Sequence, residues 1–148
     1  MLSVIYILCN LTFFNIRVVS GSMIPTIQIN SRLLCLKTKN IKRGDIVVFY
    51  SQEENKYLVK RLIGEPGDTV DIRSGSVYIN GEYFDEFYVK SNSEYTGTFN
   101  VPENSYFFLG DNRGDSRDAR YWENTYIHKD YIIAKVLWKL YPNFGGVN

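Results

Sequence analysis

Apolar and polar residues alternate in short runs along most of the chain, which is the pattern of β-strands whose two sides face different surroundings. Turn residues separate these runs, most clearly Pro66-Gly67 and Asn80-Gly81, and the second pair is typical of a two-residue hairpin loop. The pattern predicts strands at residues 32–37, 46–50, 57–63, 70–72, 77–79, 83–87, 106–109 and 131–140. Between them, polar residues 90–104 predict a surface loop, and Pro142, Gly145 and Gly146 predict a frayed tail.

The N-terminal segment differs from the rest, because residues 2–16 are apolar and carry no charge before Arg17. A helix of that length reaches about 22 Å, which is less than the roughly 30 Å of a bilayer core. No basic residue precedes the run and no Ala-x-Ala follows it, which disfavours a cleaved secretory signal. We expect residues 1–19 to be an uncleaved membrane anchor, incomplete as a membrane span, and residues 20–148 to be the β domain.

Composition agrees with one mainly β domain. The 148 residues include 12 Tyr and 9 Phe, which favour strands, and this length suits a single domain. The 17 basic and 16 acidic side chains nearly cancel, so the overall charge does not favour nucleic acid as a partner. Cys9 and Cys35 have neither metal-site nor redox spacing, and with the single His128 they are too few for zinc. We expect Cys35 to be a small buried thiol.

The stretch Ser20-Gly21-Ser22 places two hydroxyl groups around a glycine directly after the apolar segment. In an extended backbone both serines face the same side, and Gly21 allows another chain to approach closely. A serine becomes a nucleophile only when a nearby base takes its proton. His128 lies far along the chain from the serines, without an evident orienting carboxylate, so a Ser-His-Asp triad is disfavoured.

Lys60 is the alternative base. It follows Tyr57-Leu58-Val59 and precedes Arg61, so one of two adjacent basic residues must face the apolar side of the predicted strand. Burial lowers the pKa of a lysine because it disfavours the ammonium, whereas a guanidinium stays protonated. Taken singly, these residues fit a polar turn and a solvated strand lysine better than a catalytic site.

Four motifs occur in order, namely Ser-Gly-Ser-Met-Ile-Pro-Thr at 20–26, Arg-Gly-Asp-Ile-Val at 43–47, Lys-Arg-Leu-Ile-Gly-Glu-Pro-Gly-Asp at 60–68 and Gly-Asp-Asn-Arg-Gly-Asp-Ser-Arg-Asp-Ala-Arg at 110–120. With these motifs the chain resembles the type I signal peptidase (leader peptidase) family, bacterial-type membrane proteases that use a Ser/Lys dyad. It departs from the family pattern at Ala119, where the family usually has serine. The resemblance implies a mainly β fold, a compact domain of coiled antiparallel sheets preceded by a short N-terminal membrane segment.

The resemblance implies catalytic roles for four residues. Ser22 is the nucleophile and Lys60 is its general base. Ser20 adds its hydroxyl to the backbone N–H of Ser22 to bind the oxyanion that forms on the attacked carbonyl. Ser116 orients the Lys60 amine through a hydrogen bond.

Two further residues of the last motif are expected to support the site. Asp118 and Arg120 lie two apart and can form an ion pair that braces the loop around Ser116. Ala119 points the other way if the segment is extended. Met23 and Ile24 are expected to line the pockets for small substrate side chains and to touch lipid.

The implied substrates are signal peptides of exported preproteins, cleaved after small residues at Ala-x-Ala-like sites, without a metal or organic cofactor. The implied location is the cell membrane, with one membrane pass and the catalytic domain on the extracytoplasmic side, in contact with lipid and not with nucleic acid. Two alternatives remain open. The chain could be a relative dedicated to one substrate, such as a conjugative-transfer peptidase, or an inactive membrane-tethered domain that binds extended peptides by adding a strand. Self-cleaving repressors also use Ser and Lys, but this chain has no room for their DNA-binding module.

Overall fold

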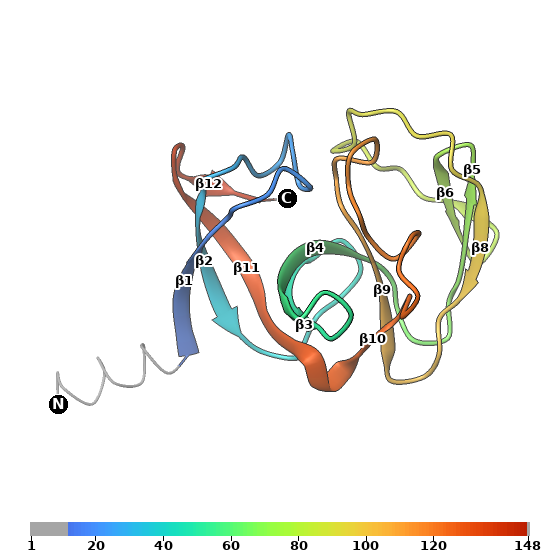
Figure 1. The fold of residues 1–148 in the computed structure, drawn as a ribbon, viewed down its shortest axis with the longest axis horizontal. Coiled ribbons are helices and arrows are strands. Elements are labelled where there is room, and N and C mark those ends of the chain that lie inside the picture. The colour runs from blue at the N-terminus through green and yellow to red at the C-terminus, as the bar shows by residue number, and fades with distance from the viewer. Residues whose placement is uncertain (1–11, 148) are drawn as a thin grey trace, which may run out of the picture.

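Two antiparallel sheets form the protein in the computed structural model, which describes residues 12–147 (Figure 1). The larger sheet has the order β1-β2-β11-β3-β4-β9-β10, with β12 beside β11, and the smaller has the order β7-β6-β5-β8. The strands of the larger sheet are β1 (Phe13–Arg17), β2 (Arg32–Lys37), β3 (Ile46–Ser51), β4 (Lys56–Gly64), β9 (Ser105–Leu109), β10 (Ile127–His128), β11 (Ile132–Tyr141) and β12 (Gly145–Gly146). Those of the smaller sheet are β5 (Thr69–Arg73), β6 (Ser76–Ile79), β7 (Glu82–Tyr83) and β8 (Gly97–Asn100). The expected mainly β, antiparallel fold is confirmed.

Strand β3 lies between two hydrophobic clusters and is buried on both faces. Val47 and Phe49 belong to one cluster, and Ile46 and Val48 belong to the other, as strand alternation requires. The Phe49 ring stacks on Phe108 with centroids 4.4 Å apart. Because β3 is packed from both sides, it gives its hairpin partner β4 a rigid support.

The smaller sheet joins the larger one through a shared core. The cluster that contains Phe49 also contains Val70 of β5 and Val101, which follows β8. At the end of β4, a Cβ on Gly64 would lie 2.7 Å from a Val70 methyl and 2.8 Å from a Val101 methyl, so this junction admits only glycine without rearrangement. The two sheets therefore pack as one body.

Most of the predicted strands are confirmed to within one or two residues, but three predictions are wrong in part. The predicted strand at 83–87 is limited to the short β7, and the predicted loop at 90–104 contains β8. In β8 the outward side chains are polar and bond to β5, since Thr98 donates to Asp71 at 2.9 Å and Asn100 accepts from Thr69 at 3.0 Å. The tail is not frayed throughout, because β12 pairs with β11 and Val147 is buried.

Part of the predicted anchor forms a strand. Residues 1–11 lie outside the described residues, and Phe13–Arg17 form β1, which pairs with β2. Phe14 and Ile16 pack against the second cluster while their neighbours are exposed, which is the period of a strand rather than of a helix. Within residues 12–147 no helix is long and apolar enough to cross a membrane. An anchor in the remaining residues stays a prediction.

Candidate active site

The two serines lie on the loop that connects β1 to β2. Its ends are held together because Val18 donates to the Ser31 carbonyl at 2.9 Å and Asn30 donates to the Val18 carbonyl at 2.8 Å. Met23 and Ile27 anchor the loop in the second cluster, where each is at most 1% exposed. The hydroxyl oxygens of Ser20 and Ser22 lie 3.4 Å apart, so the two side chains do face the same side.

Lys60 is buried on β4 with a hydroxyl as its hydrogen-bond partner. The side chain is 3% exposed, and its Nζ donates to Ser116 Oγ at 3.1 Å. Among the described residues, no carboxylate forms an ion pair with Lys60. Burial therefore lowers the pKa of Lys60 from 10.5 to about 8, even though the more distant charges of Asp118 and Glu54 act in the opposite direction.

Arg61 is also buried, but it lies on the other face of β4 and has a carboxylate partner. Its guanidinium forms two hydrogen bonds to Asp111, at 2.8 and 2.7 Å, and the Tyr88 ring lies 3.8 Å from the guanidinium carbon. Thr26 donates to the same carboxylate at 2.5 Å. Asp111 therefore links strand β4 to the loop between β1 and β2 that carries Ser20 and Ser22 (the serine loop), a role that the sequence did not indicate.

The loop after β9 clamps the serine loop against Ser116. Asn112 donates its backbone N–H to the Ser22 carbonyl and its side-chain amide to the Gly21 carbonyl, both at 3.0 Å. A Cβ on Gly110 would lie 2.1 Å from Ser116 Oγ and 2.5 Å from the Ser22 carbonyl oxygen. Glycine at this position thus lets Ser22 and Ser116, far apart in the sequence, lie against one another.

Asp118 and Arg120 form the expected ion pair, and it is almost fully buried. Arg120 donates to the two Asp118 oxygens at 2.8 and 3.0 Å, and Asp118 also accepts from the Gly110 N–H at 3.0 Å. Arg120 further donates to the Ser116 carbonyl at 3.4 Å. Ala119 between them is buried in the core.

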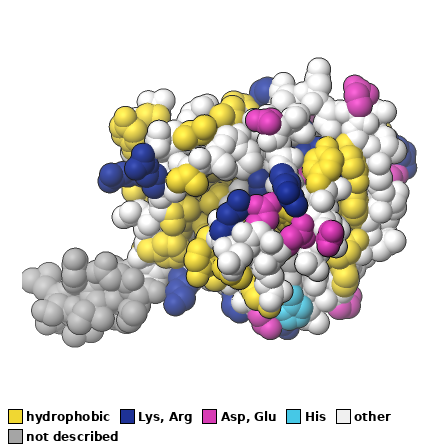
Figure 2. Space-filling model, viewed as in Figure 1, with side chains coloured by type: hydrophobic (Ala, Val, Ile, Leu, Met, Phe, Trp, Pro, Cys, Tyr) yellow, Lys and Arg dark blue, Asp and Glu magenta, His cyan; other side chains and the backbone are white. Residues whose placement is uncertain are grey.

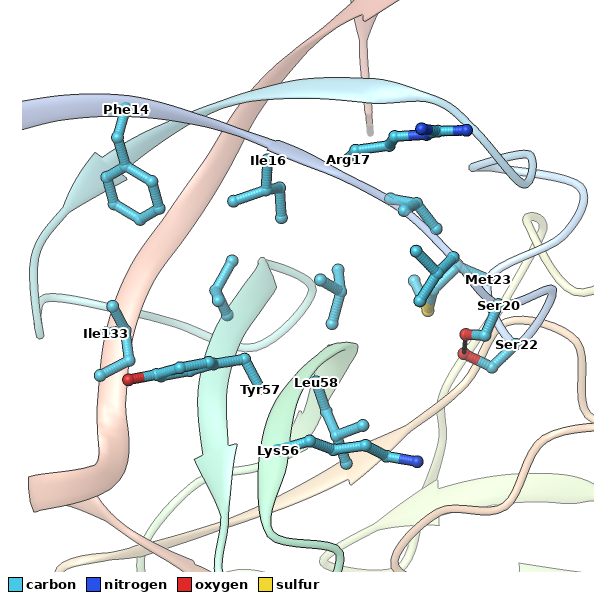
Figure 3. Close-up of a pocket in the computed structure, with 14 residues that line it drawn as sticks. Phe14, Ile16, Arg17, Ser20, Ser22, Met23, Lys56, Tyr57, Leu58 and Ile133 are labelled. Atoms are coloured by element: carbon cyan, nitrogen blue, oxygen red, sulfur yellow. Dashed lines mark hydrogen bonds between the residues drawn. The ribbon is translucent and has the colours of Figure 1, made fainter.

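An apolar cleft of about 440 Å³ opens beside the serines (Figure 3). Its walls come from β1, β3, β4 and β11, and Ser20, Ser22 and Met23 lie at one end. Ile24 is half-buried and does not line it. In the described part of the chain, β1 pairs only with β2, and β4 pairs with β9 only from Arg61 onward, so both strands have an unpaired edge at the cleft.

The buried lysine lies on β4, a strand that lines the cleft. Leu58 and Val59 of β4 line the cleft, whereas Lys60, the next residue, is buried and is not among the lining residues. Among the residues that the structure describes, no hydrogen bond joins Ser22 to Lys60, and the Ser22 N–H has no acceptor. The N–H is thus available to a ligand.

His128 lies away from these residues. Its side chain is 44% exposed at the end of β10, where its Nδ1 lies 3.3 Å from an Asp130 oxygen and accepts from the Asp130 N–H. It lines a different cavity, together with Tyr50 and Tyr131. Cys35 is a buried free thiol whose pKa is raised to about 12 by burial, whereas Cys9 lies outside the described residues. Residues 12–147 contain no cluster of His, Cys, Asp and Glu that could hold a metal.

Comparison with known proteins establishes the family. The sequence matches the family described as signal peptidase, peptidase S26, over residues 1–141. The chain belongs to this family. The resemblance to signal peptidases inferred from the motifs is therefore confirmed.

Named relatives agree with this membership. A signal peptidase I of Leptolyngbya laminosa is 37% identical over 136 residues, covering 83% of this chain and 66% of the relative. Signal peptidase I P of Bacillus subtilis subsp. natto is 38% identical over 140 residues, covering 84% and 76%. A crystal structure of a signal peptidase I from Enterococcus faecalis superimposes with a TM-score of 0.54 at 36% identity, covering 63% of this chain and 93% of that one. This chain thus spans only about two thirds of the first of these relatives.

The buried ammonium predicts a measurable pH dependence of stability. Because the pKa of Lys60 is lower in the folded state, the unfolded state holds the proton between about pH 8 and 10.5, so wild-type stability rises with pH across that window. A shift of this size costs roughly 3 kcal/mol at neutral pH. We expect Lys60→Met to raise the free energy of unfolding at pH 7, with the gain fading by about pH 10.5.

Urea unfolding followed by tryptophan fluorescence measures this difference. Lys37→Met, at the exposed end of β2, is the control and should show no such pH dependence. A gain for Lys60→Met that is constant from pH 7 to 10.5 would contradict the lowered pKa.

Proposed function

We propose that this protein is a membrane-associated serine endopeptidase that removes N-terminal signal peptides from exported preproteins, with Ser22 as nucleophile and Lys60 as general base. The observation that carries the proposal is the buried Lys60 ammonium, which is bonded to Ser116 and lies on the strand whose preceding residues line a cleft that Ser22 also lines. Membership in the signal peptidase family supports the same chemistry.

Lys60 supplies the base in this mechanism. Its pKa of about 8 leaves a usable neutral fraction near neutral pH, and only the neutral amine can accept a proton. The Ser22 hydroxyl turns from Ser20 toward Lys60 when substrate binds, a tightening that is common on going from a free to a loaded site. Lys60 takes the Ser22 proton, and Ser22 attacks the peptide carbonyl. Ser116 keeps the amine oriented, and the buried pair Asp118–Arg120 holds Ser116 in place.

Ser20 and the Ser22 N–H receive the oxyanion. The Ser20 hydroxyl lies 3.4 Å from Ser22 Oγ, close enough to reach an oxygen on the attacked carbon. The leaving amine departs with the proton held by Lys60. Water, deprotonated by the same lysine, then releases the acyl group from Ser22.

An extended peptide fits the cleft between the unpaired edges of β1 and β4. Backbone hydrogen bonds from both edges would hold it, and its alternate side chains would enter the apolar cleft. We propose small residues at these positions, as in an Ala-x-Ala-like site. Met23, which lines the cleft, would contact one of them.

An exposed surface of the large sheet supports contact with lipid. Trp138, Tyr141 and Phe144 are at least 50% exposed, and Trp138 packs edge-on against Phe144. Arg17 and Arg32 face each other across β1 and β2 beside them, and neither forms an ion pair among the described residues. Figure 2 shows hydrophobic and basic side chains together on the part of the surface that the large sheet forms. Exposed aromatic and basic groups of this kind suit a bilayer with anionic headgroups, which accords with the proposed association with a membrane.

Substitution of either member of the dyad should abolish cleavage. We expect Ser22→Ala, Lys60→Ala and Lys60→Arg each to lower kcat/KM on a signal-peptide substrate by about 10³-fold or more, because nucleophile and base act as a unit. The measurement is chromatographic detection of product in detergent, with circular dichroism to check the β fold. Ser76→Ala and Lys37→Ala, both exposed, serve as controls. Retained turnover in any dyad variant would exclude the assignment, and unimpaired peptide binding without wild-type turnover would favour a binding domain.

The pH dependence of the rate should identify lysine as the base. We expect kcat/KM to rise with pH through an apparent pKa near 8, because the neutral amine is the active form, whereas a histidine base would give a value near 6.5. His128→Ala should leave this profile unchanged. Ser116→Ala should lower the rate and perturb this rising limb, since it forfeits part of the roughly 10²- to 10⁴-fold that a positioned base contributes. Loss of the main ionisation in His128→Ala would overturn the mechanism.

A further inference from the structure

The tip of the β3–β4 hairpin carries a glutamate with three partners. The Glu54 carboxylate forms an ion pair with Lys56 at 2.7 Å and a second with Arg117 at 3.5 Å, and it accepts from Trp122 Nε1 at 3.2 Å. The side chain is only 15% exposed although it lies on a turn. Burial alone would raise the pKa of Glu54, but the hydrogen bonds from Lys56 and Trp122 outweigh it and lower the pKa, so the group is ionised at neutral pH.

Neighbouring contacts tie the same hairpin to the same loop. Glu53 accepts from Arg117 at 3.3 Å and from the backbone N–H of Asn124 at 2.9 Å. Trp122 is 5% exposed and packs edge-on against Phe49 of β3. The hairpin tip is therefore docked onto residues 117–124, which directly follow Ser116.

This docking joins the same two segments, strand β4 and the loop that contains Ser116, as the hydrogen bond of the proposed base does. Lys56 and Lys60 lie on the same face of β4, four residues apart, and Arg117 is the residue after Ser116. The buried Lys60–Ser116 hydrogen bond is one contact between β4 and this loop. Glu54 provides a second, nearer the surface, by contacting both Lys56 and Arg117. In Figure 3 Lys56 extends along the lower wall of the cleft toward the end where Ser20 and Ser22 lie.

We propose that Glu54 is a positioning residue for the catalytic base, which locks the β3–β4 hairpin to the loop after Ser116 and, with Lys56, sets the charge around Lys60. The inference rests on the proposed role of Lys60 as base. It assigns to the hairpin tip a part in catalysis that none of the four sequence motifs contains.

The charges around Lys60 make the proposal testable, because they predict the direction in which the pKa of Lys60 shifts in each variant. The groups that face its ammonium are Asp118 and Arg120 on the loop, Glu54 on the hairpin and Lys56 on its own strand. Asp118 and Arg120 neutralise each other in a buried ion pair. Glu54 favours the Lys60 ammonium and Lys56 disfavours it, so removing one charge or the other should shift the pKa of Lys60 in opposite directions.

The experiment uses the full chain in detergent micelles and follows Lys60 by carbon-13 NMR of its side chain against pH, assigned with Lys60→Arg. Glu54→Gln should lower the Lys60 pKa and Lys56→Gln should raise it, each by about 0.3 to 1 unit. Glu82→Gln on β7 and Lys37→Gln on β2, both exposed, are the matched controls and should leave it unchanged.

Kinetics on a soluble signal-peptide substrate test the positioning role. Glu54→Gln keeps an acceptor for Trp122 and should retain most of kcat at its own optimum pH. Glu54→Ala removes the contacts that hold the hairpin to the loop. It should lower kcat about tenfold with less than about a twofold change in KM. The acidic limb of the rate profile should move in each variant as the NMR pKa moves.

Several outcomes would overturn the inference. Unchanged Lys60 pKa values, or shifts of the same sign in Glu54→Gln and Lys56→Gln, would do so, as would an effect confined to KM. If any of these contradicting results is obtained while Lys60→Ala is inactive, the inference about Glu54 has failed but the proposed dyad has not. If Lys60→Ala is active, the proposed dyad has failed and the inference with it.

Discussion

The burial of the Lys60 ammonium against a hydroxyl, with no carboxylate of residues 12–147 in an ion pair with it, is the constraint on which the rest of the site depends. A lysine in this position destabilises the fold at neutral pH, so the surroundings must hold it firmly. Strand β3, packed on both faces, supplies one wall, and the buried pair Asp118–Arg120 braces the loop that supplies the other. Strand alternation sends Arg61 to the opposite face, where Asp111 neutralises it. Of these two adjacent basic residues, Arg61 is paired with a carboxylate and Lys60 is not, and only Lys60 can act as a base.

A second constraint brings the serine loop to this lysine. Gly110 lacks the side chain that would separate Ser116 from the Ser22 carbonyl, and Asn112 bonds both Ser22 and Gly21 through their carbonyls. Asp111 holds Thr26 of the same loop. One short turn after β9 therefore holds the loop of the proposed nucleophile against Ser116, the hydrogen-bond partner of the proposed base.

Local spacing was enough to predict that Ser20 and Ser22 share a side, that one of Lys60 and Arg61 faces the apolar side of a strand and that Asp118 pairs with Arg120, whereas the choice of Lys60 came from the family resemblance. It did not predict the contacts of Glu54 or the link from Arg61 to Thr26, because those join segments far apart in the chain and depend on how the hairpin and loops pack. Strand β8 was missed because its outward residues are polar and held by side-chain bonds to β5. Strand β1 was read as part of an apolar run because the charge-free residues before it hid its alternation.

The most direct test of the central claim is a crystal structure with a peptide aldehyde whose carbonyl takes the place of the scissile one. We predict a covalent bond from the aldehyde carbon to Ser22 Oγ, the peptide lying between β1 and β4, the new oxygen within hydrogen-bond distance of Ser20 Oγ and the Ser22 N–H, and Lys60 Nζ bonded to Ser22 Oγ. An imine on Lys60, or a covalent bond to Ser20 or to any residue other than Ser22, would contradict the account.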